Sequence, residues 1–325
     1  MNTPDPDGLR SLLAAVDPDT LEVVLPGPDE ALAVIRPTTP AAAADAVGQL
    51  RRGLVPWTVG PLSPGRRPCR PVVVLDVSRL SRVDPVQPQA GLVRVEAGVR
   101  METLARLLRA EGFTADPLFS RLLVGRTLAG EQGRLSDPGS AGPCLADRVV
   151  ALQAALPDGS LLTTPLAPRR ATGPDLAALL LGSGGMLGVI LAATLRVDRL
   201  PQRITTLGYV LPDEHAAQRA LACLQGAGLP LTGLVTEGVR LVVRLAGPAS
   251  IVQAGRLAVE RLLTRFAAQA AEPDGSLLAA RVPPPHPHSA EVEGLTAYLR
   301  RSLDPAGLLL TTDEACGREP AARAE

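Results

Sequence analysis

The chain has 325 residues, enough for about two domains, and 46% of them are hydrophobic against 20% charged. This balance excludes a wholly disordered chain and predicts a buried core. The 33 Lys and Arg residues equal the 33 Asp and Glu residues, so the formal net charge is zero. A neutral chain has no overall field to attract nucleic acid or anionic lipid, which argues against nucleic acid as a partner.

Several reactive residue types are scarce. The sequence has no lysine, which excludes a Schiff-base lysine and a Walker A phosphate loop. Two of its three histidines, His286 and His288, lie in a proline-rich segment that reads as an exposed linker. The cysteines form no Cys-x-x-Cys pair, so we expect no metal site and reduced thiols in a cytoplasmic protein; they are Cys69, Cys144, Cys223 and Cys316. The first seven residues lack the features of a signal peptide.

One stretch has the length of a membrane span. Residues 176–195 carry no charge until the end of the run, and about 20 apolar residues can cross a bilayer. The middle of the stretch is Gly182-Ser183-Gly184-Gly185, which favours a short helix, a glycine turn and a buried strand instead. We expect no transmembrane segment, with a membrane helix as the alternative.

The elements before residue 200 follow from local signals. Thr39 and Pro40 are typical of a helix cap and first turn, Gly112 of a helix end, and residues 157–159 of a reversal between two strands. These signals predict helices over 9–16, 41–52, 101–112 and 174–182, and strands over 31–35, 72–75, 92–96, 149–156, 160–164 and 189–195.

The pattern changes after residues 198–202, which are the candidate domain boundary. Beyond it, strands alternate with helices, which predicts a second, small α+β domain. The predicted strands are 204–211, 231–236 and 239–245, and the predicted helices are 213–224, 249–271 and 290–303.

Five segments, in order, resemble the FAD-binding domain of the vanillyl-alcohol-oxidase type, also called PCMH type. They are 34–40, 73–80, 95–104, 170–176 and 181–190, of which the last two carry the most specific signature. The segment 303–308 is similar to the closing Asp-Pro-x-Gly of that family. Within that family, the sequence looks most like the FAD-binding subunit of bacterial glycolate oxidase.

The resemblance implies a fold and a division of the chain. The fold class is α+β: a PCMH-type FAD-binding domain of two α/β subdomains, followed by a small α+β domain of ferredoxin-like form. The expected parts are an N-terminal helical extension over 1–27, the FAD-binding domain over 28–200, the small cap-like domain over 201–315 and a disordered tail over 316–325.

The resemblance also implies a non-covalent FAD site built from glycine-rich turns, because backbone amides reach a diphosphate only where side chains leave room. The implied cofactor-binding residues are Val59, Gly60, Pro61, Leu62, Ser63, Thr127, Ala129, Gly130, Gly182, Gly188, Val189 and Ile190. Pro61 lacks an amide donor, and Leu62 and Ala129 are bulkier than the glycines of the family. A Rossmann loop at Gly182 is rejected, because it would follow a strand and open a helix, whereas this turn follows a helix.

Two functions remain open. In the first, the chain is the FAD-binding subunit of an oxidoreductase that resembles glycolate oxidase and works with a catalytic flavoprotein and an iron–sulfur subunit. In the second, the degenerate loop at 59–63 has lost FAD, and the chain is a structural subunit for a catalytic flavoprotein. The sequence assigns no catalytic residue, so fold resemblance alone leaves the activity open.

Overall fold

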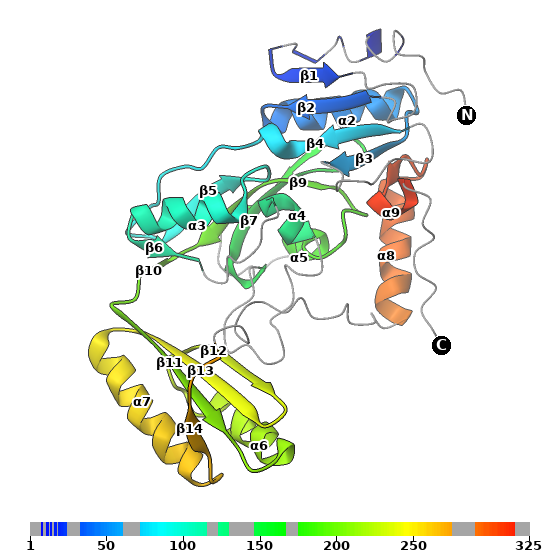
Figure 1. Ribbon diagram of the computed structural model, residues 1–325. Coiled ribbons are helices and arrows are strands. Elements are labelled where there is room, and N and C mark those ends of the chain that lie inside the picture. The colour runs from blue at the N-terminus through cyan, green and yellow to red at the C-terminus, as the bar shows by residue number, and fades with distance from the viewer. Residues whose placement is uncertain are drawn as a thin grey trace.

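A computed structural model of the chain describes residues 8, 11–12, 14, 16–17, 19–24, 33–60, 72–115, 123–129, 146–166, 175–274 and 290–315. Two sheets and their helices form the larger part, and a third sheet with two helices lies apart from them (Figure 1). The predicted helix over 9–16 falls mostly outside the described residues, as do residues 1–7 and the predicted tail 316–325.

The first sheet has the strand order β1-β2-β4-β3-β15. Strand β1 is antiparallel to β2, whereas β2, β4, β3 and β15 run parallel. The carboxyl ends of these parallel strands therefore share one edge, where ligands bind in many α/β sheets. The strands are β1 (Leu21–Val24), β2 (Ala33–Pro37), β3 (Trp57–Gly60), β4 (Val73–Asp76) and β15 (Leu309–Leu310).

Helix α2 (Pro40–Arg52) lies between the first sheet and the second. The Thr39 hydroxyl accepts a hydrogen bond from Ala42 N at 3.1 Å, and Pro40 occupies the first turn, as the sequence predicted. Alanines make up much of the buried surface of α2, so the backbone can approach strands of both sheets closely. Helix α2 thus joins β2 to the second sheet.

The second sheet is antiparallel, with the order β5-β9-β7-β8. Strand β9 contributes side chains to two cores: Val189 packs in the core around α2, and Ile190 packs in a second core. This second core also contains side chains of α3, α4 and α5. The elements are β5 (Leu92–Glu96), β7 (Val149–Ala155), β8 (Leu161–Thr163), β9 (Val189–Arg196), α3 (Met101–Ala110), α4 (Val124–Ala129) and α5 (Leu176–Leu180).

Short elements link these layers, among them the 3-10 turns η1 (Val77–Arg79) and η3 (Ala146–Arg148) and the strand pair β6 (Phe113–Thr114) and β10 (Asp198–Arg199). The apolar stretch 176–195 becomes α5, the glycine turn and most of β9. Within the described ranges, no helix combines the length and apolar character that crossing a bilayer requires.

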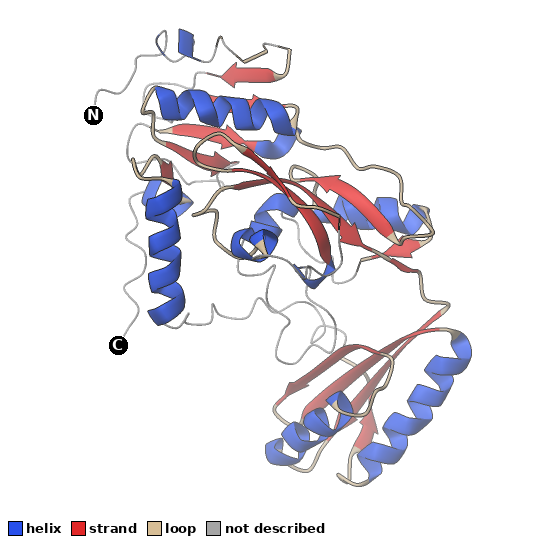
Figure 2. Cartoon of the chain, turned by 180° about the vertical axis from the view of Figure 1, so that it is seen from behind, coloured by secondary structure: helices blue, strands red, loops and turns tan. Residues whose placement is uncertain are grey.

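The small domain follows the order β-α-β-β-α-β, with strands arranged β12-β13-β11-β14. This connection order is that of the ferredoxin-like motif. Both helices pack on one face of the sheet around a core of their own, and the domain lies apart from the larger sheets in both views (Figures 1 and 2). Its elements are β11 (Arg203–Val210), α6 (Glu214–Gln225), β12 (Leu231–Glu237), β13 (Arg240–Gly247), α7 (Ala249–Thr264) and β14 (Gln269–Ala271).

Two boundaries differ from the sequence-based prediction. Helix α7 ends at Thr264 and not near Ala271, because Ala267 adopts a left-handed φ of 53° and the chain then enters β14. Alanine is not a residue type that indicates a left-handed turn, so the apolar run predicts a continuous helix.

The second difference concerns the end of the small domain, which the sequence placed at residue 315. Helix α8 (Ala290–Leu303) and β15 pack on the two larger sheets: Leu303 borders the second core and Leu309 lies in the first. The last element, α9 (Thr312–Ala315), also contacts β3. The described part of the small domain therefore ends at residue 274, since residues 290–315 return to the first sheet.

Candidate functional site

Gly60 closes β3 at the carboxyl edge of the first sheet. It pairs with Asp76 of β4, and a Cβ added at Gly60 would lie 2.5 Å from Cγ1 of Val74. Glycine is therefore required here by packing within the sheet. Val59, beside it, is half-buried and packs against the first core.

Two of the turns that the resemblance implied meet each other. The amide of Gly182 donates to the carbonyl of Leu128 at 2.9 Å, and the amide of Gly184 donates to that of Ala129 at 2.7 Å. The glycine turn thus satisfies carbonyls at the end of α4, which would otherwise be unpaired. Residues far apart in the sequence, at 128–129 and 182–184, are brought to one place by these bonds.

Thr127 and Gly188 serve the framework of this joint. The hydroxyl of Thr127 donates to Leu123 O at 3.0 Å within its own turn of helix. Gly188 has a φ of 155°, and a Cβ there would lie 2.7 Å from Ala155 O, so the chain must carry glycine where β9 begins. Val189 and Ile190 point into opposite cores, and neither side chain is free to reach a ligand.

The glycine turn has one bare stretch of backbone. Gly184 and Gly185 both have left-handed φ values, 65° and 79°, and no described atom lies within 4 Å of a Cβ added to either. Consecutive glycines in such a conformation leave the main chain accessible to a closely approaching group. The cofactor-binding residues that the resemblance implied do not include Gly184 and Gly185, although both lie inside the quoted signature.

Further glycines lie where the part built on the first sheet contacts the part built on the second sheet. A Cβ on Gly98 would lie 2.2 Å from Val77 O, and one on Gly125 would lie 2.5 Å from the Cβ of Ala97. The amide of Gly125 donates to Ala97 O at 2.9 Å. Gly98 thus contacts η1, which follows β4, and Gly125 of α4 contacts Ala97. These contacts link the edge of the first sheet that bears Gly60 to α4, which in turn bonds to the glycine turn. Gly98 lies in the Val-x-x-Gly segment, the signal that could have identified its role.

An ionic network lies at the carboxyl edge of the first sheet. The carboxylate of Asp76, which is 5% exposed, accepts from Arg36 Nε at 3.0 Å and from Ser78 N at 3.0 Å. Glu22 pairs with Arg79 at 2.8 Å and with Arg36 at 3.6 Å. Asp76, the last residue of β4, therefore caps η1 and pairs with Arg36, and neither role requires a ligand.

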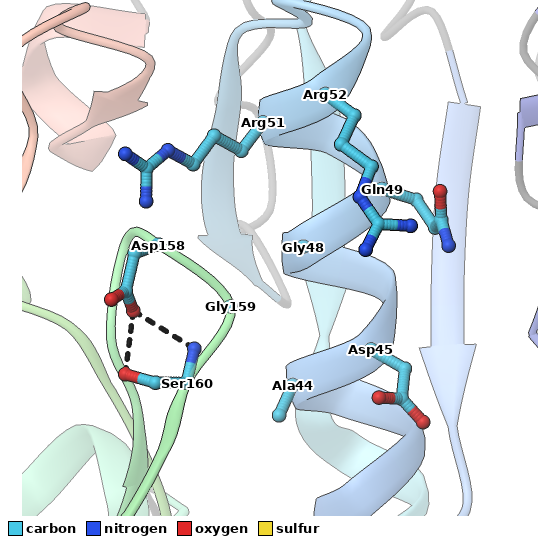
Figure 3. A pocket seen from close by; sticks show the side chains of 9 residues that line it. All are labelled: Ala44, Asp45, Gly48, Gln49, Arg51, Arg52, Asp158, Gly159 and Ser160. Carbon is cyan, nitrogen blue, oxygen red and sulfur yellow. Dashed lines mark hydrogen bonds between the residues drawn. The ribbon is translucent and has the colours of Figure 1, made fainter.

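A hollow of about 600 Å³ lies outside this joint, between α2 and the turn that links β7 to β8 (Figure 3). Burial would raise the pKa of Asp158, but hydrogen bonds from Ser160 and the charge of Arg51 outweigh it, so the pKa lies below its ordinary value. Gly159 needs its glycine, since its Cβ would lie 2.4 Å from Cα of Gly48. The close backbone contact explains the Pro-Asp-Gly turn as packing.

Four residues of the implied site lie outside the described residues: Pro61, Leu62, Ser63 and Gly130. Three of the cysteines, Cys69, Cys144 and Cys316, also lie outside them. In the part of the chain that the structure describes, no group of three His, Cys, Asp or Glu side chains could hold a metal ion. Cys223, which is half-buried, has a free thiol.

Residues 31–165 match the family model described as an FAD binding domain. This match agrees with the resemblance of the sequence to PCMH-type FAD-binding domains. In Escherichia coli strain K12, the uncharacterized FAD-linked oxidoreductase YgcU is 30% identical over 150 residues, covering 43% of this chain and 30% of that protein. Mitochondrial D-lactate dehydrogenase (cytochrome) of Arabidopsis thaliana is 28% identical over 193 residues, covering 58% and 34%. The chain spans about a third of the length of these curated relatives.

Solved structures of the PCMH-type family share the fold. An alkyldihydroxyacetonephosphate synthase matches with a TM-score of 0.65 at 19% identity, covering 86% of this chain and 63% of that one. The 4-ethylphenol oxidase from Gulosibacter chungangensis matches with a TM-score of 0.59 at 15% identity, covering 94% and 67%. The α+β fold expected from the sequence is confirmed by these neighbours.

FAD is the cofactor to which the family model points, and the relative in Escherichia coli is FAD-linked by name. The described residues fit it in one respect: the bare backbone of Gly184 and Gly185 leaves room that a side chain would fill. Gly182 and Gly184 already use their amides in hydrogen bonds to the end of α4, and Thr127 and Gly188 take part in hydrogen bonding or packing within the framework.

Proposed function

We propose that the chain is the FAD-binding subunit of an oxidoreductase that oxidises a 2-hydroxy acid, as the resemblance to glycolate oxidase suggests. The single observation that carries the proposal is the joint between α4 and the glycine turn, where two motifs distant in sequence meet beside bare backbone. The relative in Arabidopsis, a D-lactate dehydrogenase by name, supports a 2-hydroxy acid as the substrate class. FAD, when bound, supplies the acceptor for a hydride.

This chain contributes binding and orientation in the proposal. Gly184 and Gly185 would lie against the cofactor, while Gly60 and Gly98 fix the opposite half of the framework. The proposal assigns none of the described tyrosines and histidine as the substrate base, because Tyr209, Tyr298 and His215 lie on β11, α8 and α6 and not in the glycine turn. An iron–sulfur subunit would receive the electrons.

The second candidate is a structural subunit that no longer binds FAD. Pro61 and Leu62 interrupt the expected glycine run, and the amides of Gly182 and Gly184 are already used by α4. If so, the protein would keep its fold and its catalytic flavoprotein partner while it takes up no cofactor.

Titration with FAD distinguishes the two candidates. We expect the purified protein to show flavin absorbance between about 350 and 500 nm, or to acquire it with a Kd no weaker than micromolar. Gly185→Val should weaken this uptake by about tenfold or more, because its side chain would enter the open space.

Gly228→Val is the matched control. Gly228 also has a left-handed φ, 64°, with no described atom within 4 Å of an added Cβ, but it lies in a turn of the small domain. Both variants place a valine at a left-handed φ, so a loss of FAD uptake only in the first assigns the effect to the site. The absence of uptake by the wild type at high micromolar FAD would favour the structural subunit.

A further inference from the structure

The last described residues of the chain are joined by an ion pair and several hydrogen bonds. Arg300 makes two parallel contacts with Glu314, at 2.9 Å from Nη1 and 2.8 Å from Nη2, and Nη2 also donates to Leu309 O at 3.0 Å. Glu314 further accepts from Thr311 N at 2.8 Å, and the Thr311 hydroxyl accepts from Glu314 N at 3.2 Å. We call residues 300–314 the C-terminal clasp. A paired guanidinium and carboxylate are among the strongest polar contacts in proteins.

A second carboxylate fixes the turn inside the clasp. Asp304 is 7% exposed, and its two oxygens accept from Leu308 N at 3.1 Å and from Leu309 N at 2.8 Å. Loss of either acceptor would leave a buried amide unpaired. Asp304 and Arg300 together therefore fix the direction in which β15 leaves the turn.

The clasp delivers β15 to the outer edge of the first sheet. The amide of Trp57 donates to Leu308 O at 2.9 Å, and Leu309 and Leu310 pair with Trp57 and Thr58 of β3. Without β15, β3 would be an unprotected edge strand only four residues long, and short edge strands are readily lost from a sheet.

Helix α8, which carries the start of the clasp, also touches the second core. Leu299 and Leu303 of α8 pack against the second core, which contains α4 and α5, while Leu308 and Leu309 lie in the first core. Figure 1 shows α8 and α9 running beside β3 and down past the level of α5. One segment of the chain is thus anchored in both cores of the larger part.

We propose that the C-terminal clasp is a positioning device that holds β3, and with it Gly60, at a fixed place relative to the α4–glycine-turn joint. Arg300, Asp304 and Glu314 are positioning residues in this role and do not touch the cofactor. The consequence for FAD rests on the proposed function, whereas the effect on β3 does not.

Trp57 gives a direct readout, because it is the only tryptophan in the sequence, is fully buried and bonds to the clasp. In Glu314→Gln and Asp304→Asn we expect acrylamide to quench Trp57 fluorescence more strongly than in the wild type. Hydrogen exchange of the β3 amides should accelerate by about fivefold to thirtyfold, while β13 amides keep their rates. The Kd for FAD should rise by a similar factor, with an unchanged spectrum at saturation.

Glu260→Gln is the matched control, since it also removes a carboxylate paired with an arginine, Arg256 at 3.4 Å, but on α7 of the small domain. It should leave Trp57 quenching and β3 exchange unchanged. Arg300→Lys keeps the charge but loses the paired geometry, so it should give an intermediate effect and provides a milder variant if Asp304→Asn does not fold.

Each half of the proposal can fail separately. If Glu314→Gln and Asp304→Asn leave Trp57 quenching and β3 exchange unchanged, or if Glu260→Gln changes them equally, the clasp does not hold β3. If β3 loosens but the Kd for FAD stays constant, the positioning role is overturned while FAD binding stands. If the wild type binds no FAD, the proposed function fails, and the fluorescence and exchange results still decide whether the clasp holds β3.

Discussion

Thr58 has a fully buried hydroxyl that finds no hydrogen-bond partner within the described ranges. A buried polar group without a partner costs about 1–3 kcal/mol, and valine has nearly the same shape as threonine. Thr58→Val should therefore stabilise the protein by about 1–2 kcal/mol in urea unfolding. A loss of stability would show that the hydroxyl has a partner, and a selective loss of FAD affinity would place that partner on the cofactor.

Thr164 provides the contrast for this substitution. It is 4% exposed, and its hydroxyl accepts from Leu152 N at 2.8 Å. Thr164→Val leaves that amide without its acceptor, so this variant should lose about 1–2 kcal/mol. Opposite signs for two equally buried threonines would show that satisfaction of the hydroxyl, and not β-branched shape, decides the outcome.

Glu314 predicts a pH dependence of stability. Burial raises its pKa, but the hydrogen bond from Arg300, the Thr311 amide and the charge of Arg300 together lower it to about 2, against an ordinary 4.5. A lowered folded-state pKa stabilises the protein above pH 4.5, and this contribution disappears as pH falls toward 2. At pH 7, Glu314→Gln should be less stable than the wild type by about 1 kcal/mol, after allowance for its partial exposure to solvent.

Urea unfolding of both proteins at several values between pH 7 and pH 2.5 tests this dependence. The difference in unfolding free energy should be constant near neutrality and shrink in acid. A difference that stays the same down to pH 2.5 would show that the carboxylate charge contributes nothing to the clasp.

At the scale of elements, glycine contacts hold η1 and α4 to the second sheet. A Cβ on Gly98 would lie 2.2 Å from Val77 O and 2.7 Å from both Ser78 O and Leu80 O, all of them backbone atoms. Gly98→Ala should therefore destabilise the protein by about 3 kcal/mol or more, since the backbone of η1 must move. Thermal unfolding measures the change.

Gly294 is the control for that substitution. It lies exposed in α8, and no described atom lies within 4 Å of an added Cβ. Gly294→Ala should stabilise the protein by about 0.5–1 kcal/mol, because alanine favours the helix. Equal effects of the two substitutions would contradict the packing role of Gly98.

Elements with local signals were predictable from the sequence. Thr39 and Pro40 begin α2 as expected, Gly112 follows α3 with a φ of 83°, and Gly159 makes the turn between β7 and β8 with a φ of 85°. Strands β14 and β15 are only three and two residues long, and long-range pairing alone defines them. No periodicity can reveal elements of that length.

The site was predictable in part, for the same reason. The glycine signature identified the turn at 182–188, because glycine at a positive φ has a local cause. That Gly182 and Gly184 donate to the end of α4 depends on how two distant segments pack, so the sequence assigned Gly182 to the cofactor instead. The bare pair, Gly184 and Gly185, emerged only once the positions of neighbouring atoms were known.

At the scale of the whole molecule, the small domain is held by a short, well-anchored segment. Asp198 pairs with the 8% exposed Arg148 at 2.7 Å, and Leu200 N donates to Gly112 O at 2.9 Å. The next contact, from Ala249 N to Gln202 at 3.3 Å, belongs to the small domain. On the side where the chain enters the small domain, the transition therefore lies around Pro201.

The small domain should be removable without loss of the FAD-binding fold. Its core is separate from the other two, and β14 runs antiparallel to β11, so the chain leaves the sheet toward the end where it entered. We expect a variant with residues 203–274 replaced by a short Gly/Ser linker to fold, because the clasp still completes the first sheet. Trp57 should remain shielded from acrylamide, and FAD should bind within about tenfold of the wild-type Kd. Loss of both properties would show that the small domain stabilises the first sheet and the FAD site directly, whereas loss of FAD alone would make this domain part of the binding site.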